Sequence, residues 1–430
     1  MTEGRREPPG AQGHPTAAED DKTTAIVATP PAAEADARPA VMLLGSGELS
    51  RELAIALRHL GARVIAVDEY PHAPAHGVAD LSLIVPMTTA GELSKAIQRL
   101  RPDFVVTATD AVCVDALEAL QGLKAAGPDD KVTELVPNAR TVRLTSDREG
   151  LRRLAADQLG LPTAPFWFVG SIGELEAVAA HAGFPLLVKP VTGVAGPRRS
   201  VVTGPDDVGP AWRRAVGGGA GAPQRVLAET VVEIEFDVTL LVVRGDRPHG
   251  PLIEFCSPIG HTGADGDVLE SWQPQQMSAA ALDAARSIAA RIVKALGGRG
   301  VFGVELMING DEVYFADVIA RPHKSAWVTL RSQRLSAFEL QARAILGLPL
   351  DTMMMSPAAA RAINPGHDGK GPTADALTGA LAVPESDLRL FGRGSRPAGA
   401  THKLGVALAT APDVAKARDR ARRVVAALRP

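Results

Sequence analysis

The sequence predicts a multidomain protein that combines an α/β domain with α+β domains. Its 430 residues exceed the length of one ordinary domain. Short apolar runs first alternate with amphipathic stretches, and strand signals separated by glycine-rich turns then dominate. We expect four regions: a disordered tail at 1–38, an N-terminal Rossmann-like domain at 39–145, a central domain at 146–350 and a small β-rich domain at 351–430.

The composition is that of a globular protein. Hydrophobic residues make up 46% and charged residues 22%, and the net charge of -3 argues against a general nucleic-acid binder. No apolar run reaches the roughly 18 residues of a membrane span, and the first residues contain no apolar signal region. Cys113 and Cys256 lie in apolar segments, which is typical of free thiols in a reducing compartment. We therefore expect a cytoplasmic protein.

The elements of the N-terminal domain follow one another in a βα order. Residues 1–38, rich in Pro, Ala, Gly, Glu and Asp, precede them without periodicity. The apolar patterns predict strands at 39–44, 63–67, 81–85 and 104–106, and helices at 48–60 and 93–100. Such alternation is typical of a parallel, doubly wound sheet.

The remaining chain changes character after a helix at 147–159 and the prolines Pro162 and Pro165. The pattern predicts strands at 186–189, 226–229, 236–243, 301–308 and 312–318, and helices at 174–182 and 280–296. Strands at 380–383 and 404–409 are expected in the C-terminal unit.

A glycine-containing turn joins the first strand to the first helix. Gly45 and Gly47 would let the backbone approach a phosphate at the helix N-terminus. Ser50 stands where a dinucleotide fingerprint has its third glycine, and Asp68 stands where a ribose-binding acid would be. A dinucleotide site and a tight turn without a ligand both remain open.

Glu305 and Asp317 form a more informative pair, because a turn signal at 309–311 lies between them. A two-residue loop would place the two carboxylates on opposite faces of the hairpin. A three-residue loop would place them on the same face, close enough to share a divalent cation. The alternative is a solvated sheet face, which the apolar flanking residues disfavour.

Three charged residues end or follow apolar strands. Lys189 and Glu229 each end such a run, and Arg321 lies just beyond Asp317, where its fork could hold a carboxylate or phosphate. Each could also form a structural ion pair, and their joint occurrence favours an anion-binding cleft.

Seven segments resemble the formate-dependent phosphoribosylglycinamide formyltransferases, which are ATP-grasp enzymes of purine synthesis. They are VMLLGSGELSRELAIALRHLGARVIAVDEYPHAPAH, REGLRRLAA, FPLLVKPV, ESWQPQQMS, ALGGRGVFGVEL, ARPHKSAWVTL and KLGVALATA. The resemblance implies an ATP-grasp fold, with the central domain as the ATP-grasp domain, and a homodimer. It also implies a reaction in which ATP and Mg²⁺ activate formate as formyl phosphate, which the amine of the phosphorylated glycinamide riboside then attacks.

The resemblance also implies roles for individual residues. The nucleotide-binding positions are Arg148 and Lys189 for phosphates, Glu229, Thr230, Val231 and Val232 for the adenine side, and Asp237 for ribose. The magnesium positions are Glu305 and Asp317, and Arg321 is the catalytic candidate. The substrate-binding positions are Glu48, Leu49, Lys324, Arg393, His402 and Lys403.

Four departures from the family pattern concern the acceptor and the phosphate loop. Ala108 replaces a glutamate, and Lys324 replaces an aspartate, so negative charge is lost where the acceptor's ammonium would bind. Asp110 could supply the missing acid. The loop at 193–198 lacks the family's serines and lysine, and His402-Lys403 replaces two arginines. These departures leave open a related ligase with another acceptor, or a nucleotide-binding relative without catalysis.

Overall fold

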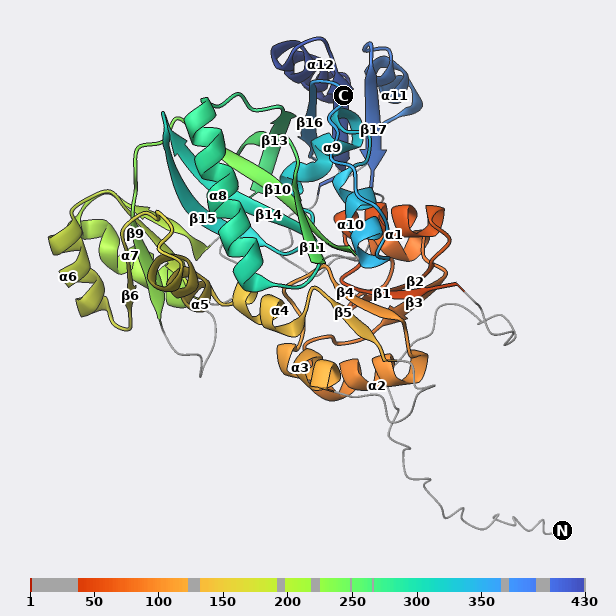
Figure 1. Cartoon of the computed structure of the whole chain (residues 1–430), viewed down its shortest axis with the longest axis horizontal. Coiled ribbons are helices and arrows are strands. Elements are labelled where there is room, and N and C mark those ends of the chain that lie inside the picture. Colours follow the sequence, from red (N-terminus) through yellow and green to blue (C-terminus); the bar gives the residue numbers. More distant parts are fainter. Residues whose placement is uncertain are drawn as a thin grey trace.

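The computed structural model describes residue 1 and residues 38–122, 132–191, 198–217, 225–247, 250–264, 267–364, 371–391 and 403–428. A parallel-sheet domain, a small lobe and a long antiparallel sheet follow one another along the chain (Figure 1). Of the expected tail at 1–38, residues 2–37 lie outside the described ranges. None of the helices within these ranges combines the length and hydropathy needed to cross a bilayer.

The N-terminal domain is the predicted doubly wound sheet. Its five strands are all parallel, in the order β3-β2-β1-β4-β5. Its elements are β1 (Ala40–Leu44), α1 (Glu48–His59), β2 (Arg63–Asp68), β3 (Leu81–Ile84), α2 (Ala90–Leu100), β4 (Phe104–Thr107), α3 (Val114–Gly122), β5 (Glu134–Val136) and α4 (Ala139–Ser146). Every residue of β1 is buried, which explains its continuous apolar run.

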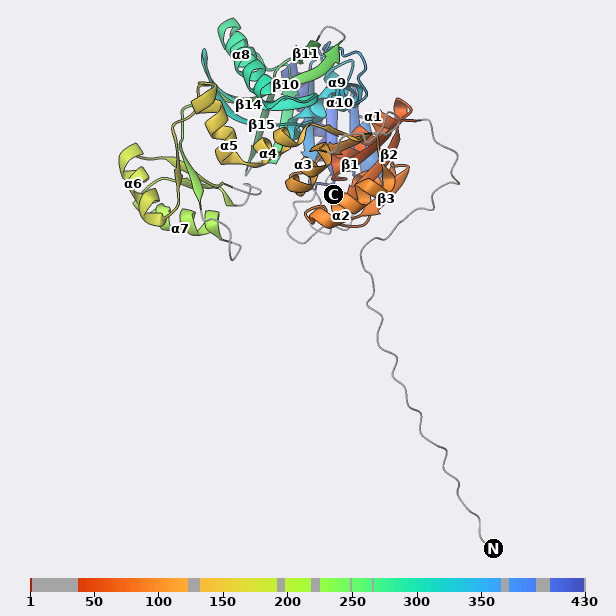
Figure 2. The same ribbon diagram turned by 60° about the horizontal axis from the view of Figure 1, so that its bottom comes forward.

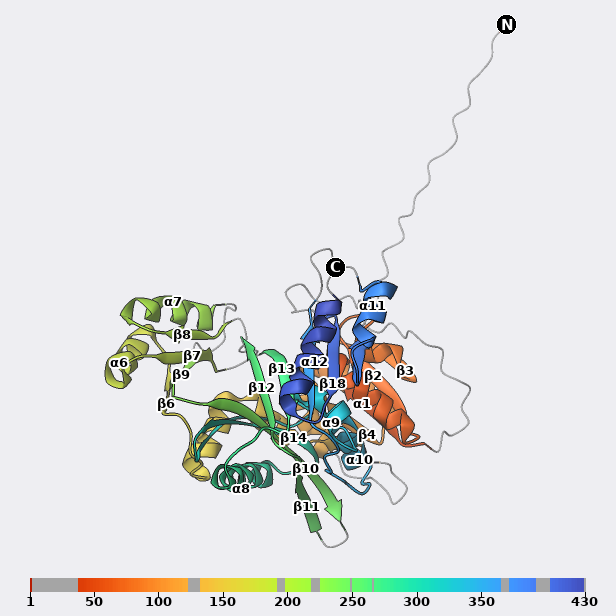
Figure 3. The same ribbon diagram turned by 90° about the horizontal axis from the view of Figure 1, so that it is seen from above.

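A small lobe extends to one side of the molecule (Figures 1, 2 and 3). Its antiparallel sheet has the order β6-β9-β7-β8, and α6 and α7 pack together on it. Its elements are β6 (Phe166–Val169), α6 (Ile172–Ala182), β7 (Leu186–Pro190), β8 (Ser200–Val202), α7 (Pro205–Val216) and β9 (Val226–Thr230). The helix α5 (Arg148–Arg153), continued by a π-helical turn at Leu154–Gln158, connects it to the N-terminal domain.

The long sheet has nine strands and contains both the central and the C-terminal strands. Their order is β15-β14-β10-β12-β13-β16-β18-β17, and β11 pairs with β10. The central elements are β10 (Phe236–Arg247), β11 (Gly250–Phe255), β12 (Ile259–Ala264), β13 (Asp267–Gln273), α8 (Ala279–Leu296), β14 (Gly300–Asn309), β15 (Glu312–Ile319), a 3₁₀ turn at Lys324–Val328, α9 (Thr329–Ser332) and α10 (Ala337–Ile345).

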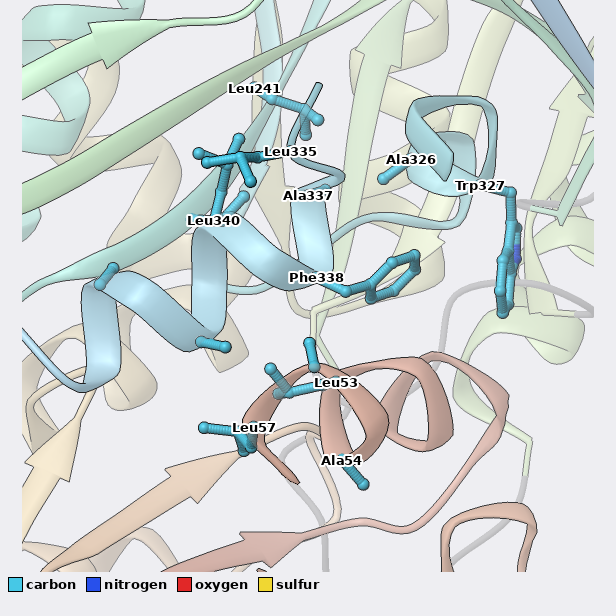
Figure 4. Packing of buried hydrophobic residues seen from close by; sticks show 14 of the residues in the cluster. Leu53, Ala54, Leu57, Leu241, Ala326, Trp327, Leu335, Ala337, Phe338 and Leu340 are labelled. Carbon is cyan, nitrogen blue, oxygen red and sulfur yellow. The ribbon is translucent and has the colours of Figure 1, made fainter. Parts of the chain in front are cut away.

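Strand alternation divides the side chains of β10 and β14 between two cores. Leu240 and Val304 pack with α8 on one face, whereas Leu241 and Val301 pack with α10 on the other. That second core continues into the N-terminal domain, where Leu53 of α1 lies beside Phe338 of α10 (Figure 4). Polar residues with odd numbers on β10 and β14 therefore point away from α8.

The C-terminal elements are β16 (Ala358–Ile363), α11 (Ala374–Leu381), β17 (Ser386–Leu390), β18 (Gly405–Thr410) and α12 (Val414–Ala427). The strand expected at 404–409 is confirmed as β18, but the strand expected at 380–383 is wrong. Thr373 caps a helix there by accepting a hydrogen bond from Ala376 N, and that helix includes Ala380. A short apolar run cannot distinguish a strand from a helix turn by periodicity alone.

The family-like segment ESWQPQQMS holds the C-terminal strands to the long sheet. Glu270 of β13 is buried and accepts hydrogen bonds from Arg361, Arg418 and Arg422. Arg418 also stacks 3.8 Å from the centre of the Trp272 ring. These contacts give Glu270 and Trp272 a structural role.

Candidate active site

Glu305 and Asp317 face each other across the β14–β15 hairpin. The loop has two residues, because Asn309 pairs with Glu312, so the three-residue loop that would place the carboxylates on one face does not form. A bulge in β15 nevertheless brings the two carboxylates onto the same face. Glu305 pairs with Asp317 and Leu306 with Phe315, which leaves Ala316 unpaired. Directly paired residues share a face, so the two carboxylates lie on the face opposite α8.

Glu305 is surrounded by donors from three other segments. It accepts from Thr239 Oγ1 at 2.7 Å and contacts His261 Nε2 at 3.0 Å and His323 Nδ1 at 3.4 Å. Burial raises the pKa of Glu305, but His323, His261 and Thr239 outweigh it and lower the pKa to about 2. Glu305 is therefore an anion at neutral pH.

Asp317 has the opposite electrostatic balance. Burial raises its pKa above the ordinary value, and Val318 N–H, Arg148 and Lys189 only partly offset that effect. A dication beside it would favour the ionised carboxylate, so this donor set fits Mg²⁺, which takes one or two carboxylates together with phosphate oxygens. Within the described ranges, no group of three or more His, Cys, Asp or Glu residues forms a complete metal site.

A buried ion triad lies next to this hairpin. Glu229 of β9 pairs with Lys189 of β7 at 2.5 Å and with Arg152 of α5. Burial raises the pKa of Glu229, but Lys189 and Arg152 outweigh it, so the net shift is downward. Lys189 also lowers the pKa of Asp317, so its charge acts on both Glu229 and the predicted metal carboxylate.

The other predicted nucleotide residues line the connection between the lobe and the long sheet. Arg148 donates to Pro190 O at 3.0 Å. Thr230 ends β9, and Val231 and Val232 follow in the extended link to β10, where Val231 is 42% exposed. Asp237, at the start of β10, pairs with His261 of β12. An exposed apolar side chain such as Val231, with polar groups nearby, is suited to pack against the flat face of a nucleotide base.

The N-terminal turn lies across from the hairpin. Gly45 has φ 95°, and a Cβ there would lie 2.8 Å from Thr109 Cβ, so the turn requires glycine. Asp68 is buried, and its two oxygens accept from Ser46 N and Glu69 N at 2.6 and 2.8 Å. Because the turn itself uses this buried carboxylate, the structure disfavours Asp68 as a ribose ligand and with it the dinucleotide hypothesis.

A pocket joins this turn to the segment after β15. Leu49, Ala108 and Arg321 are among its lining residues, and Glu48 begins α1 beside it. Arg321 binds Asp110 through two hydrogen bonds of 2.8 Å each. Partial burial raises the pKa of Asp110, but Arg321 and Arg148 outweigh it and hold the pKa below its ordinary value.

A second pocket lies between β13 and the C-terminal strands. Lys324 and Lys403 both line it, together with Trp327 and Phe391, whose ring centres are 5.1 Å apart. Lys403 Nζ donates to Val268 O at 2.7 Å. The structure thus places Lys324 beside a predicted phosphate-binding lysine, and Ala108 in the other pocket.

Several predicted positions lie outside the described residues. They are Arg393, His402 and the first five residues of the loop at 193–198. Conversely, the sequence did not reveal Arg152, Thr239 or His261 as neighbours of the site. Alternation predicts which face a side chain occupies, but it does not give the register between strands that are distant in sequence.

Comparisons with known proteins agree with this geometry. A family model for the ATP-grasp domain matches residues 154–338, and a model described as PurT, C-terminal, matches residues 358–428. The fold and the site thus define an ATP-grasp enzyme. The N5-carboxyaminoimidazole ribonucleotide synthetase of Thermotoga maritima shares this fold, with a TM-score of 0.75 at 23% identity over 91% of this chain and 99% of its own.

More similar proteins narrow the class. The formate-dependent phosphoribosylglycinamide formyltransferase of Corynebacterium glutamicum (strain R) is 47% identical over 90% of this chain and 94% of its own. That of Burkholderia pseudomallei (strain 668) is 48% identical over 91% and 95%. The structure of glycinamide-RNase-transformylase T from Mycobacterium tuberculosis is 65% identical, with a TM-score of 0.76, over 90% and 99%. This chain belongs to the family of formate-dependent phosphoribosylglycinamide formyltransferases.

Proposed function

We propose that the protein formylates phosphoribosylglycinamide in purine biosynthesis, with formate as the one-carbon donor. A formate oxygen attacks the γ-phosphorus of ATP, which gives formyl phosphate and ADP. The acceptor's amine then attacks the formyl carbon, phosphate leaves, and the amine loses a proton. The observation that carries the proposal is the 47% identity to a formyltransferase over 90% of the chain.

The nucleotide residues of this chain support the first step. Lys189 and Arg148 would hold ATP phosphates, and residues 229–232 with Asp237 would hold the adenine and ribose. Positioning and electrostatic stabilisation dominate phosphoryl transfer, so fixed cations are the relevant contribution. The Glu229 carboxylate orients Lys189 from a buried position.

Glu305 and Asp317 would hold Mg²⁺, and their opposed positions on β14 and β15 support that assignment. The cation would neutralise charge on the phosphate oxygens during transfer. Arg321 would stabilise the transferring group with the part of its fork that Asp110 leaves unused, since a guanidinium has five N–H donors.

The acceptor would lie between the two pockets. We assign its phosphate to Lys403 and Lys324, which line one pocket, together with Arg393 and His402. The glycinamide end would then reach Glu48, Leu49 and Arg321, two of which line the other pocket. The altered residues Ala108 and Lys324 keep open a related acceptor that also carries a phosphate.

The decisive experiment measures ADP release by the purified protein with ATP, Mg²⁺, formate and phosphoribosylglycinamide. We expect turnover only when all four are present, and label from ¹³C-formate in the N-formyl product. Formate-independent turnover would contradict the proposed donor. ADP release that needs formate and a different phosphorylated amine would instead support a changed acceptor.

We further propose a cytoplasmic homodimer. The dimer is proposed from the family resemblance. The two cysteines, which are both free, support a reducing compartment. Sedimentation of the purified chain would measure the oligomeric state.

A further inference from the structure

Arg152 contacts both Glu229, which binds Lys189, and the bulge of β15 beside Asp317. Neither the sequence motifs nor the resemblance assigned it a role. It lies on α5, four residues after Arg148, so both side chains project from the same face of the helix. Its side chain is 6% exposed. A buried guanidinium needs partners for its donors, and those partners are the informative feature.

The first partner is Glu229, which also binds Lys189. Lys189 is 21% exposed and Glu229 is 6% exposed, so the carboxylate is shared between a buried cation and one that reaches the cleft. With Arg152 in place, Glu229 stays ionised and fixed, and Lys189 is held at one end of the cleft. Arg152 therefore influences the nucleotide side through Glu229.

The other partners are backbone carbonyls of the β15 bulge. Arg152 Nη1 donates to Phe315 O at 3.1 Å, and Nη2 donates to Ala316 O at 3.2 Å. β15 is an edge strand, and a bulge leaves ladder groups without a partner in the sheet. The guanidinium group of Arg152 therefore supplies donors to the carbonyls of Phe315 and Ala316. Phe315 N has a partner too, because it donates to Pro162 O at 2.8 Å.

The bulge is also what places Asp317 opposite Glu305. Without Ala316 as the extra residue, the two-residue loop would turn the carboxylates to opposite faces of the hairpin. We infer that Arg152 is a positioning residue that couples the nucleotide-binding lysine to the metal-binding carboxylate, by holding Glu229 and the Ala316 bulge with one planar group. This inference rests on the proposed ATP and magnesium site.

Arg152→Lys is the sharpest variant. It keeps the charge opposite Glu229, but an ammonium lacks the planar fork that reaches Glu229 and two carbonyls together. Titration calorimetry measures ATP affinity with EDTA and with Mg²⁺, and the ratio of the two reports the contribution of the metal. We expect that ratio to fall about 10-fold or more, as for other groups that orient metal ligands. The affinity in EDTA should fall less, because the lysine keeps a positive charge opposite Glu229.

Arg153→Lys is the matched control, because Arg153 is 55% exposed and pairs with Glu149 on the surface of the same helix. Its ratio should equal that of the natural chain. Hydrogen exchange across residues 312–319 should also be faster in Arg152→Lys than in Arg153→Lys, because the bulge loses donors. If Arg152→Lys is poorly folded, Arg152→Met with Glu229→Gln removes both charges and is compared with Glu229→Gln alone.

The outcomes separate the two proposals. A natural chain whose ATP affinity does not respond to Mg²⁺ would contradict the proposed metal site, and the role of Arg152 with it. A natural chain that responds, with an Arg152 variant that keeps the same ratio, would overturn the role of Arg152 only. Equal losses of affinity in EDTA and Mg²⁺ would also overturn it, since they would indicate a general structural effect.

Discussion

Two halves of the proposed site differ in how their charges are balanced. The proposed nucleotide half consists of Arg148, Lys189, Glu229, Glu305 and Asp317, and the proposed acceptor half consists of Glu48, Ala108, Arg321, Lys324 and Lys403. In the nucleotide half, Lys189 binds Glu229 and histidines contact Glu305. In the acceptor half, Arg321 binds Asp110, and Ala108 and Lys324 stand where the family resemblance implies carboxylates. Apart from the loop at 193–198, the departures from the family pattern thus lie in the proposed acceptor half.

We therefore expect the two proposed halves to respond differently to substitution. The nucleotide half can be tested by removing single charges, which should have large effects. The acceptor half can be tested by restoring the family's residues, which should have moderate effects. We order the predictions by expected size.

Glu305→Gln should have the largest effect. The amide keeps the shape but removes the charge that would hold Mg²⁺, so we expect ATP turnover to fall by about 100-fold or more. Steady-state kinetics against Mg²⁺ concentration measures this. The control is Glu312→Gln, an exposed acid on the same hairpin that accepts from Tyr314 OH. Near-normal Mg²⁺-dependent turnover in Glu305→Gln would contradict the proposed role of Glu305 as a magnesium ligand.

The same residue predicts a change in acid stability. The pKa of Glu305 falls from the ordinary 4.5 to about 2, so its ionised form stabilises the folded state above pH 4.5. That contribution should be lost as the pH falls from 4.5 through about 2. Glu305→Gln should therefore show a weaker dependence of unfolding free energy on pH in this window, measured by urea denaturation.

Lys189→Met should weaken ATP binding by about 10- to 100-fold, the range expected for a charge-assisted hydrogen bond. It also leaves Glu229 with Arg152 as its remaining cation in the triad, so a lower melting temperature should accompany the loss. Calorimetry with ATP measures the affinity. Lys95→Met, on an exposed helix, is the control. An unchanged ATP affinity would contradict the ATP-binding role of this cleft.

Much of this arrangement could be predicted from the sequence. The parallel strands, the β14–β15 hairpin and the strands ending in Lys189 and Glu229 all follow local apolar patterns. The reason why Glu305 and Asp317 meet could not be predicted, because it depends on the Ala316 bulge. Arg152, which contacts that bulge, is 163 residues from Phe315 in sequence. Local patterns contain no signal for such a contact.

The acceptor half shows the same limit. The sequence indicated that Asp110 could replace the lost glutamate, but β4 ends at Thr107, so strand alternation does not predict where the Asp110 side chain points. Asp110 lies beyond β4 and binds Arg321, which is 211 residues away. Likewise, Lys324 was expected beside Ala108, whereas the two residues line different pockets. Tertiary packing decides these positions, and residue types alone do not.

Lys324→Asp, which restores the family's residue, should separate two roles for Lys324. Because Lys324 lines a pocket with Lys403, we expect the KM for phosphoribosylglycinamide to rise about 10-fold, with kcat changed less. Ala108→Glu, made separately and in combination, tests the amine end of the acceptor. A lower KM in Lys324→Asp would instead show that Lys324 repels the acceptor's ammonium, as the sequence alone suggested.

Asp110→Asn should have the smallest effect, and it distinguishes a supporting acid from an acid that contacts the acceptor. Asp110 is 53% exposed, and exposed ion pairs contribute about 0.2–1 kcal/mol, so we expect kcat/KM to fall only about two- to fivefold through looser placement of Arg321. Asp115→Asn, which removes an exposed partner of Arg143, is the control and should leave the kinetics unchanged. A loss of about 100-fold would mean that Asp110 binds the acceptor's amine directly and has replaced the family glutamate at position 108. In that case the acceptor half would be rebuilt around a different carboxylate, and its charge balance would be closer to that of the nucleotide half than the static ion pairs indicate.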